Sequence, residues 1–115
     1  MIAAAIEVHR HLGPGFLESV YEDALCIELA MRRMAFERQV LVHVAYKGRP
    51  LGRCKLDLVV QGQLVVELKS VDSVLPVHLA QLRSYLAATG IPLGLILNFN
   101  VPVLKAGVRR MVLTR

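Results

Sequence analysis

The chain has 115 residues and a formal net charge of +5, with 55% hydrophobic and 20% charged residues. This composition excludes a disordered chain, and the length predicts a single domain over residues 1–115. Charges interrupt every apolar stretch before it reaches the roughly 18 residues of a membrane-spanning helix, so we expect no membrane partner. Cys26 and Cys54 lack CxxC spacing, which favours reduced thiols in a cytoplasmic protein.

The first two predicted elements are helices separated by a breaker. Residues 2–12 are predicted to form a helix with Ile6 and Leu12 directed inward. The sequence "LGPG" at residues 12–15 interrupts it, because two glycines around a proline do not continue a helix. A second helix is predicted from about Phe16 to Met34. Its apolar stripe is expected to consist of Leu17, Val20, Tyr21, Ala24, Leu25 and Leu29.

A meander of three strands is predicted next. Apolar and polar residues alternate with period two over residues 36–46, which is typical of a strand with one more polar, solvent-facing side. A turn at residues 47–50 leads to a second strand at about residues 52–60. After a turn at residues 61–63, a third strand covers residues 64–70. The apolar parity of the first strand comprises Phe36, Val40, Val42, Val44 and Tyr46.

The remaining pattern predicts a helix and two further strands. Pro76 opens the helix, and Gly90 ends it at about Thr89. The apolar run at residues 93–98 is typical of a strand covered on both faces, and residues 108–113 are a candidate edge strand. A helical crossover usually leads to a parallel strand. We therefore predict an α/β fold with a mixed central β-sheet flanked by helices, in the order α-α-β-β-β-α-β-β.

The second and third strands place two acids on one face. In a hairpin centred on Gly62, Asp57 lies opposite Glu67, and directly opposed residues have Cβ atoms about 5 Å apart. Lys69 is two residues beyond Glu67 and shares that face. The other face is expected to direct Leu58, Val60, Leu64, Val66 and Leu68 into the core.

Two neighbouring carboxylates in an apolar setting require compensating charge. Buried and unpaired, each would cost several kcal/mol. Lys69 offsets one negative charge, whereas a divalent cation such as Mg²⁺ offsets both and accepts the Leu68 carbonyl as a further oxygen ligand. Lys69 would then orient or deprotonate water during phosphodiester cleavage. The alternative for Asp57, Glu67 and Lys69 is a salt bridge in a structural or interaction protein.

Three motifs resemble a known family. The pattern D-x9-E-x-K at residues 57–69 resembles the signature of the PD-(D/E)XK nuclease superfamily. The stretch "HLGPGFLESVYEDAL" at residues 11–25 is similar to the small GxxExxY proteins, with Gly15, Glu18 and Tyr21 at the named positions. The stretch "AQLRSYL" at residues 80–86 resembles the QxxxY element of part of the superfamily. The similarity extends to "NFNVPVLKAGVRR" near the end of the chain.

The resemblance implies a restriction-endonuclease-like core and a catalytic site. It makes Asp57 and Glu67 metal-binding acids, Lys69 the catalytic lysine, and Glu18 the helix acid that completes the metal site. Gln81 and Tyr85 match helix residues that border the site and touch substrate or metal. Leu56 stands where the motif has proline.

The expected function is therefore a nuclease that depends on Mg²⁺ or Mn²⁺ and acts on DNA, with RNA as a second candidate substrate. The alternative is a catalytically inactive nucleic-acid- or protein-binding module that keeps the same fold. Because so short a chain offers little surface to a long duplex, a homodimer is also expected.

Tyr21 and a basic stretch complete the candidate residues. Tyr21 is either a substrate contact or a core tyrosine whose hydroxyl bonds to a neighbour. Arg53 and Lys55 are the candidate substrate contacts of a basic stretch in which ordinary solvated charges are also expected. That stretch comprises Arg32, Arg33, Arg38, Lys47, Arg49, Arg53 and Lys55.

Overall fold

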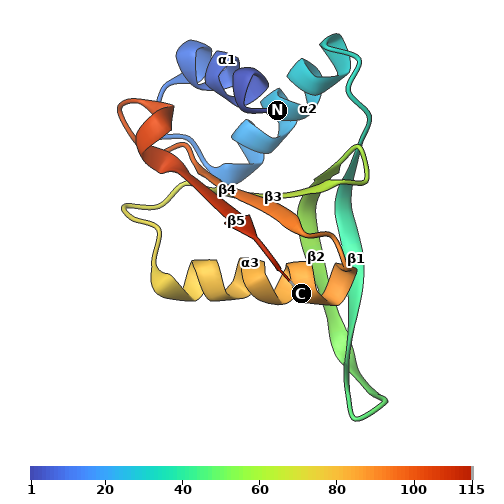
Figure 1. The fold of residues 1–115 in the computed structure, drawn as a ribbon. Coiled ribbons are helices and arrows are strands. Elements are labelled where there is room, and N and C mark those ends of the chain that lie inside the picture. Colours follow the sequence, from blue (N-terminus) through green and yellow to red (C-terminus); the bar gives the residue numbers. More distant parts are fainter. Residues whose placement is uncertain (115) are drawn as a thin grey trace.

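The computed structural model describes residues 1–114, which form the predicted order of helices and strands (Figure 1). The helices are α1 (Ile2–Leu12), α2 (Glu18–Met31) and α3 (Pro76–Thr89). The strands are β1 (Phe36–Tyr46), β2 (Arg49–Val60), β3 (Leu64–Lys69), β4 (Leu93–Asn98) and β5 (Val108–Val112). Within the described residues, no helix is long and apolar enough to cross a membrane.

The strands form one mixed sheet in the order β1-β2-β3-β4-β5. Helix α3 connects β3 to β4, and these two strands are parallel, whereas the other neighbouring strands are antiparallel. The pairs Leu58–Val66 and Val60–Leu64 confirm the hairpin register predicted around Gly62. The mixed sheet and the crossover confirm the predicted fold class.

Helices cover both faces of the sheet, and two apolar clusters form between the layers (Figure 1). Helices α1 and α2 pack on one face, where they bury Leu58, Val60 and Val66. Helix α3 packs on the other face, where it buries Val59 and Val65. The alternation follows from the period of two along a strand. It confirms that the predicted inward set of the hairpin faces the core.

The first two helices differ from their predictions at their exposed apolar residues. Ile6 is 43% exposed, because α1 turns Ala4, Ala5 and Val8 toward the core and these small side chains allow close approach. The prediction of an inward Ile6 was therefore wrong. Helix α2 begins at Glu18, so Leu17 lies outside it and is 76% exposed. Val20 is also exposed, and α2 ends at Met31, earlier than predicted.

The first hairpin is longer than predicted and extends beyond the helices (Figure 1). Strand β2 already begins at Arg49, which shortens the predicted turn to Lys47 and Gly48. Val44 and Tyr46 share the parity of buried Val42, yet they are 41% and 60% exposed. No helix covers the end of this hairpin. We call residues 41–55 the β-arm.

Candidate active site at the fork between β2 and β3

Strand β2 leaves β3 at Asp57. The ladder between the two strands ends at the pair Leu58–Val66, although β3 continues to Lys69. Leu56 lies in the cluster under α3, whereas Leu58 lies in the cluster under α1 and α2. Residues two apart on a regular strand share a face, so the chain rotates between them. The result is a fork with Asp57 at its apex.

Strand β1 is irregular at the same level. Arg38 pairs with Leu58 and Val40 pairs with Leu56, so Gln39 lies opposite Asp57. Gln39 has a φ of 51°, a left-handed conformation that is uncommon for residues other than glycine. Both strands therefore depart from regular geometry at the fork, and this departure turns the β-arm away from the rest of the sheet.

The two predicted acids meet at the fork through reciprocal hydrogen bonds. The backbone N–H of Leu68 donates to Asp57 Oδ2 over 2.8 Å. The backbone N–H of Asp57 donates to Glu67 Oε1 over 3.2 Å. Asp57 and Glu67 are not ladder partners, because the ladder has already ended, but each carboxylate binds backbone of the opposite strand. These bonds fix both side chains.

Burial makes the acid pair electrostatically unfavourable when both groups are charged. Glu67 is only 6% exposed. Burial, followed by the charge of Asp57, raises the pKa of Glu67 to about 8. Burial also raises the pKa of Asp57, against the lowering effect of the hydrogen bond from Leu68. Near neutral pH the pair therefore retains a proton unless a cation replaces it.

Lys69 and Glu18 lie near the two acids, and Lys69 forms no ion pair with either of them. Lys69 ends β3 and is half-buried, and its ammonium lies more than 4.0 Å from every carboxylate oxygen of Asp57, Glu67 and Glu18. Desolvation of the Glu18 carboxyl by neighbouring atoms raises its pKa, although the residue is exposed overall. The Lys69 charge opposes this shift, and the Asp57 charge adds to it. The charges of Glu18, Asp57 and Lys69 thus influence one another from three different elements.

The loop before α2 is fixed to the end of β3. Ser70 Oγ donates to the Phe16 carbonyl over 2.6 Å. Tyr21 is fully buried and stacks on Phe99 with ring centroids 4.5 Å apart. Its hydroxyl donates to the Gly13 carbonyl and accepts the Phe16 N–H. These contacts favour the core alternative for Tyr21, because no part of the side chain is open to a substrate. They also hold Glu18 beside the fork.

Helix α3 brings Tyr85 to the acid pair. Tyr85 is half-buried, and burial followed by the charge of Glu67 raises its pKa. Gln81 lies one turn earlier on α3 and is exposed. His78 lies a further turn back, where its charge lowers the pKa of Glu18. Sequence reasoning missed His78, although its spacing from Gln81 and Tyr85 places all three on one side of a helix.

Among the predicted basic residues, two have partners elsewhere. The Arg38 guanidinium contacts Glu22 and Asp23 over 2.7 Å in each case. Arg32 contacts Glu28 over 2.7 Å. The Arg38 pairs link β1 to the first half of α2, and the Arg32 pair lies at the end of α2. Both guanidinium groups are therefore engaged, and Arg32 and Arg38 are not candidate phosphate contacts. Arg53 and Lys55 lie on the exposed β-arm.

The donor atoms at the fork fit a hard divalent cation. Asp57 and Glu67 supply carboxylate oxygens whose burial disfavours two uncompensated charges. The N–H of Leu68 points toward β2, and in an extended strand the carbonyl of the same residue points to the same side. Mg²⁺ uses few protein oxygens and keeps several waters, so such a small ligand set suffices. Within residues 1–114 no three His, Cys, Asp or Glu side chains converge, so Glu18 stands apart from the pair.

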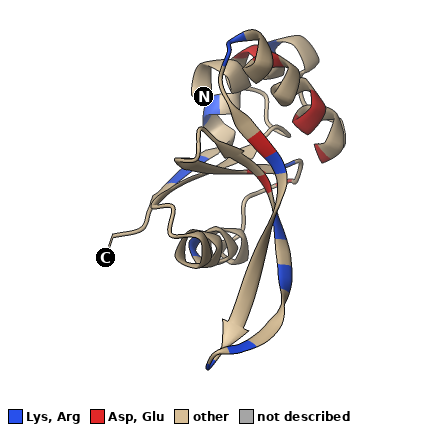
Figure 2. Ribbon diagram, turned by 90° about the vertical axis from the view of Figure 1, so that its right-hand side faces the viewer, with Lys and Arg blue, Asp and Glu red and all other residues tan. Residues whose placement is uncertain are grey.

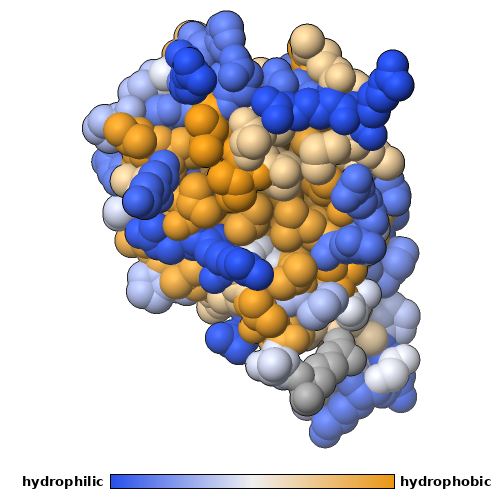
Figure 3. Space-filling model, turned by 45° about the horizontal axis from the view of Figure 1, so that its top comes forward, coloured by the Kyte–Doolittle hydropathy of each residue, from blue (hydrophilic) through white to orange (hydrophobic). Residues whose placement is uncertain are grey.

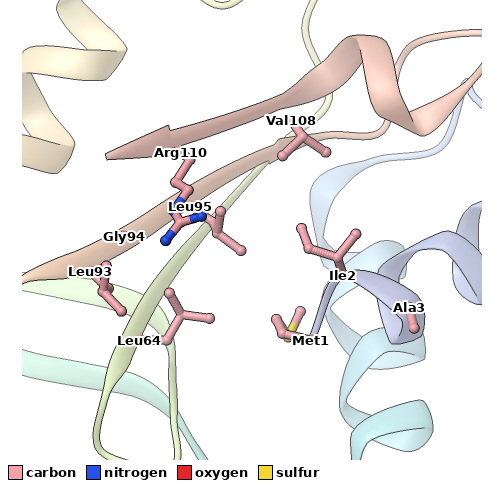
Figure 4. A pocket seen from close by; sticks show the side chains of 9 residues that line it. All are labelled: Met1, Ile2, Ala3, Leu64, Leu93, Gly94, Leu95, Val108 and Arg110. Carbon is pink, nitrogen blue, oxygen red and sulfur yellow. The ribbon is translucent and has the colours of Figure 1, made fainter. Parts of the chain in front are cut away.

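A hollow lies on another part of the molecule, away from these acids (Figure 4). It has a volume of about 480 Å³ and lies between the start of α1 and the strands β3, β4 and β5. Leu64, which begins β3, lines it, whereas Lys69 ends β3 at the fork. Its lining contains no carboxylate, histidine or cysteine, and apolar side chains gather on this side of the molecule (Figure 3). The titratable groups of the candidate site therefore lie elsewhere.

Comparison with known proteins identifies a family for this chain. A family model described as the PD-(D/E)XK nuclease superfamily matches residues 1–111. No curated protein and no solved structure matched the chain. The description of this family model names the superfamily and not the GxxExxY group, so that finer assignment stays a prediction. The match covers both the fork and the two helices beside it, and the chain belongs to the PD-(D/E)XK nuclease superfamily.

Proposed function

We propose that this protein is a nuclease that hydrolyses phosphodiester bonds of DNA and requires Mg²⁺ or Mn²⁺. Membership of the superfamily supports a nuclease-type function. The observation that carries the proposal is the reciprocal bonding of Asp57 and Glu67 at the fork. It holds two desolvated carboxylates together at a point where the sheet opens.

In this proposal the acids hold the cation. Asp57 and Glu67 provide carboxylate oxygens, and the Leu68 carbonyl provides a further one. Glu18 completes the set when substrate and water are present, because its charge is already within electrostatic reach of Asp57. When bound, the cation supplies Lewis-acid stabilisation of the negative charge that develops on the phosphate.

The remaining residues act on water and substrate. The Lys69 ammonium is free of ion pairs with the acids, so it is available to orient water and to stabilise developing negative charge. Tyr85 lies within electrostatic reach of Glu67, and Gln81 lies one turn earlier on α3; an amide and a hydroxyl there suit contacts to substrate. Tyr21 acts indirectly, by fixing the loop that precedes Glu18.

Cleavage of supercoiled plasmid by the pure protein tests the proposal. Product should form with Mg²⁺ or Mn²⁺ and disappear in EDTA. Asp57→Asn and Glu67→Gln should each lower the rate at least about 100-fold, because each removes a charged metal ligand. Glu37→Gln is the matched control, since Glu37 is an exposed acid on β1 of the same sheet. Undiminished activity in both site variants would overturn the assignment.

Linear, single-stranded and branched DNA, with RNA as a further substrate, define the substrate class. The inactive binding module makes a different prediction, in which nucleic acid or protein binds without turnover with either metal. Binding without cleavage over the whole substrate panel would therefore favour that module. Light scattering during the same experiments measures whether the protein is a homodimer.

A further inference from the structure

Beyond Val42 the β-arm is exposed and extends away from the helices (Figure 1). Every residue from His43 to Arg53 is exposed, and Val42 is the last buried residue of β1. A two-stranded hairpin that packs on nothing is marginally stable in water. The exposed length of the arm therefore adds little to the stability of the fold.

Basic residues that form no ion pair with a described carboxylate are concentrated on the arm (Figure 2). It carries Lys47, Arg49, Arg53 and Lys55, and no acid occurs between Glu37 and Asp57. Within residues 1–114 none of these four side chains has an ion pair, in contrast to Arg32 and Arg38. Four uncompensated positive charges account for most of the net charge of +5.

The arm leads directly to the fork. Lys55 is two residues from Asp57, and Arg49 lies eight residues from it along β2. At about 3.3 Å per residue, the basic side chains cover roughly 26 Å from the first strand residue to the acid pair. A duplex rises about 3.4 Å per base pair, so this length corresponds to about eight base pairs.

We propose that the β-arm binds the phosphate backbones of a double-stranded nucleic acid and places one phosphodiester at the Asp57–Glu67 fork. The proposal rests on the nuclease function proposed above and assigns its substrate as duplex. A two-stranded ribbon fits the major groove, which is about 12 Å wide. Arg53 and Lys55 are two residues apart on β2, so they project from one face of the ribbon toward the same stretch of phosphates. The positive charge of the arm disfavours a second copy of the chain as its occupant, because two arms would repel each other.

The side chains of the arm favour a duplex over a single strand. Binding of single strands relies on stacking of bases on aromatic side chains, worth about 1–3 kcal/mol per base. Tyr46 is the aromatic residue of the β-arm, and the Lys47 ammonium lies 5.3 Å from its ring centroid. The arm thus offers several phosphate contacts but few ring surfaces for stacking, namely Tyr46 and the exposed imidazole of His43.

Fluorescence anisotropy in EDTA measures this binding without cleavage. A labelled duplex of about 20 base pairs is compared with the same labelled single strand. Arg49→Gln/Arg53→Gln should weaken duplex binding about 10-fold or more and reduce the salt slope by nearly two, because each phosphate contact contributes about 0.9. Lys105→Gln/Arg110→Gln removes the same charge from β5 and the turn before it, and should change affinity less than about 3-fold.

The outcomes separate the arm from the active site. Equal weakening by both double variants, or by neither, would overturn the proposal. A single strand that binds as tightly as the duplex and loses as much affinity in the arm variant would reject the duplex assignment. A wild-type dimer that dissociates in the arm variant would make the arm a contact between copies instead.

The proposed nuclease and the proposed arm fail in different ways. If the protein binds duplex through the arm but cleaves nothing with Mg²⁺ or Mn²⁺, the proposed role of the arm is supported and the proposed nuclease activity is refuted. If the arm variant cleaves duplex with an unchanged KM, the proposed nuclease activity is supported and the proposed role of the arm is refuted. Thermal melting verifies folding, and the arm variant should melt with the wild type because both arginines are exposed.

Discussion

Replacing Glu67 by glutamine should stabilise the metal-free protein at high pH. Glu67 titrates near 4.5 when unfolded, and burial with the Asp57 charge raises its pKa to about 8 in the folded protein. Between these values the folded state holds the proton more tightly than the unfolded state. Stability therefore falls as the pH rises from 4.5 toward 8. The amide of the Glu67→Gln variant would carry no charge at any pH and would still accept the Asp57 N–H.

The size of this effect follows from the two pKa values. A difference of that size corresponds to at most about 5 kcal/mol at high pH. The sharing of one proton between Asp57 and Glu67 and the entry of water lower it, so we expect about 1–3 kcal/mol. For a chain of this length, that shifts the melting temperature by roughly 3–15 °C.

Thermal unfolding in EDTA at pH 5, 6, 7, 8 and 8.5 measures the effect. The melting temperature of the wild type should fall over this range more steeply than that of Glu67→Gln, and the two curves should diverge most at the highest pH. Glu37→Gln provides the control, because Glu37 is exposed. Parallel curves for wild type and Glu67→Gln would refute the idea that a buried, protonated acid pair lies at the fork.

Three further outcomes follow from the same geometry. At pH 8, Mg²⁺ at 10–100 times its Kd should stabilise the wild type by about 1–3 kcal/mol in thermal melts and leave Asp57→Asn/Glu67→Gln unchanged; equal stabilisation of both proteins would place the cation elsewhere. Tyr21→Phe removes two hydrogen bonds from a buried hydroxyl and should lower the unfolding free energy in urea by about 1–3 kcal/mol, with no change in KM. A raised KM without loss of stability would restore Tyr21 as a substrate contact. Lys69→Met should lower the cleavage rate at least about 100-fold and shift stability by less than about 1 kcal/mol, because Lys69 forms no ion pair with the acids; a loss of stability alone would make its role structural.

Local signals were sufficient for the elements that carry their own boundaries. Helix α3 has the predicted limits, because Pro76 fixes the first turn and Gly90 adopts the left-handed conformation, with a φ of 76°. Strand β4 was predicted from its continuous apolar run, and both of its faces are buried. Helix α2 lacked such a signal, since Phe16 and Leu17 continue the helical apolar spacing from outside the helix.

The exposure of the β-arm beyond Val42 could not be predicted from its sequence pattern. The alternation of Val42, Val44 and Tyr46 is the same along the whole strand, but burial ends after Val42. A helix of 14 residues such as α3 is only about 21 Å long, so it covers part of a strand pair that continues beyond it. Coverage depends on where another element ends, and that information lies outside the strand itself.

The candidate site was predicted as a pair of acids but not as a fork. The register around Gly62 was sufficient to bring Asp57 and Glu67 together, because it depends on the turn and on the period of two. The rotation of β2 between Leu56 and Leu58 depends on packing against two different helical layers. No local pattern in the strand encodes that choice, so the reciprocal backbone bonds of the acids were not foreseen.

The fork and the arm have a common structural origin in the unequal lengths of two strands. Strand β2 has 12 residues and β3 has 6, so the first part of β2 pairs with β1 alone. The ladder with β3 ends beside Asp57, which frees the N–H of Leu68 for a carboxylate and releases the rest of β2 into the arm. The same strand therefore positions the acid pair and carries the basic residues. Because β2 is continuous between them, inserting one residue after Lys55 would reverse the faces of the arm relative to the fork without moving Asp57.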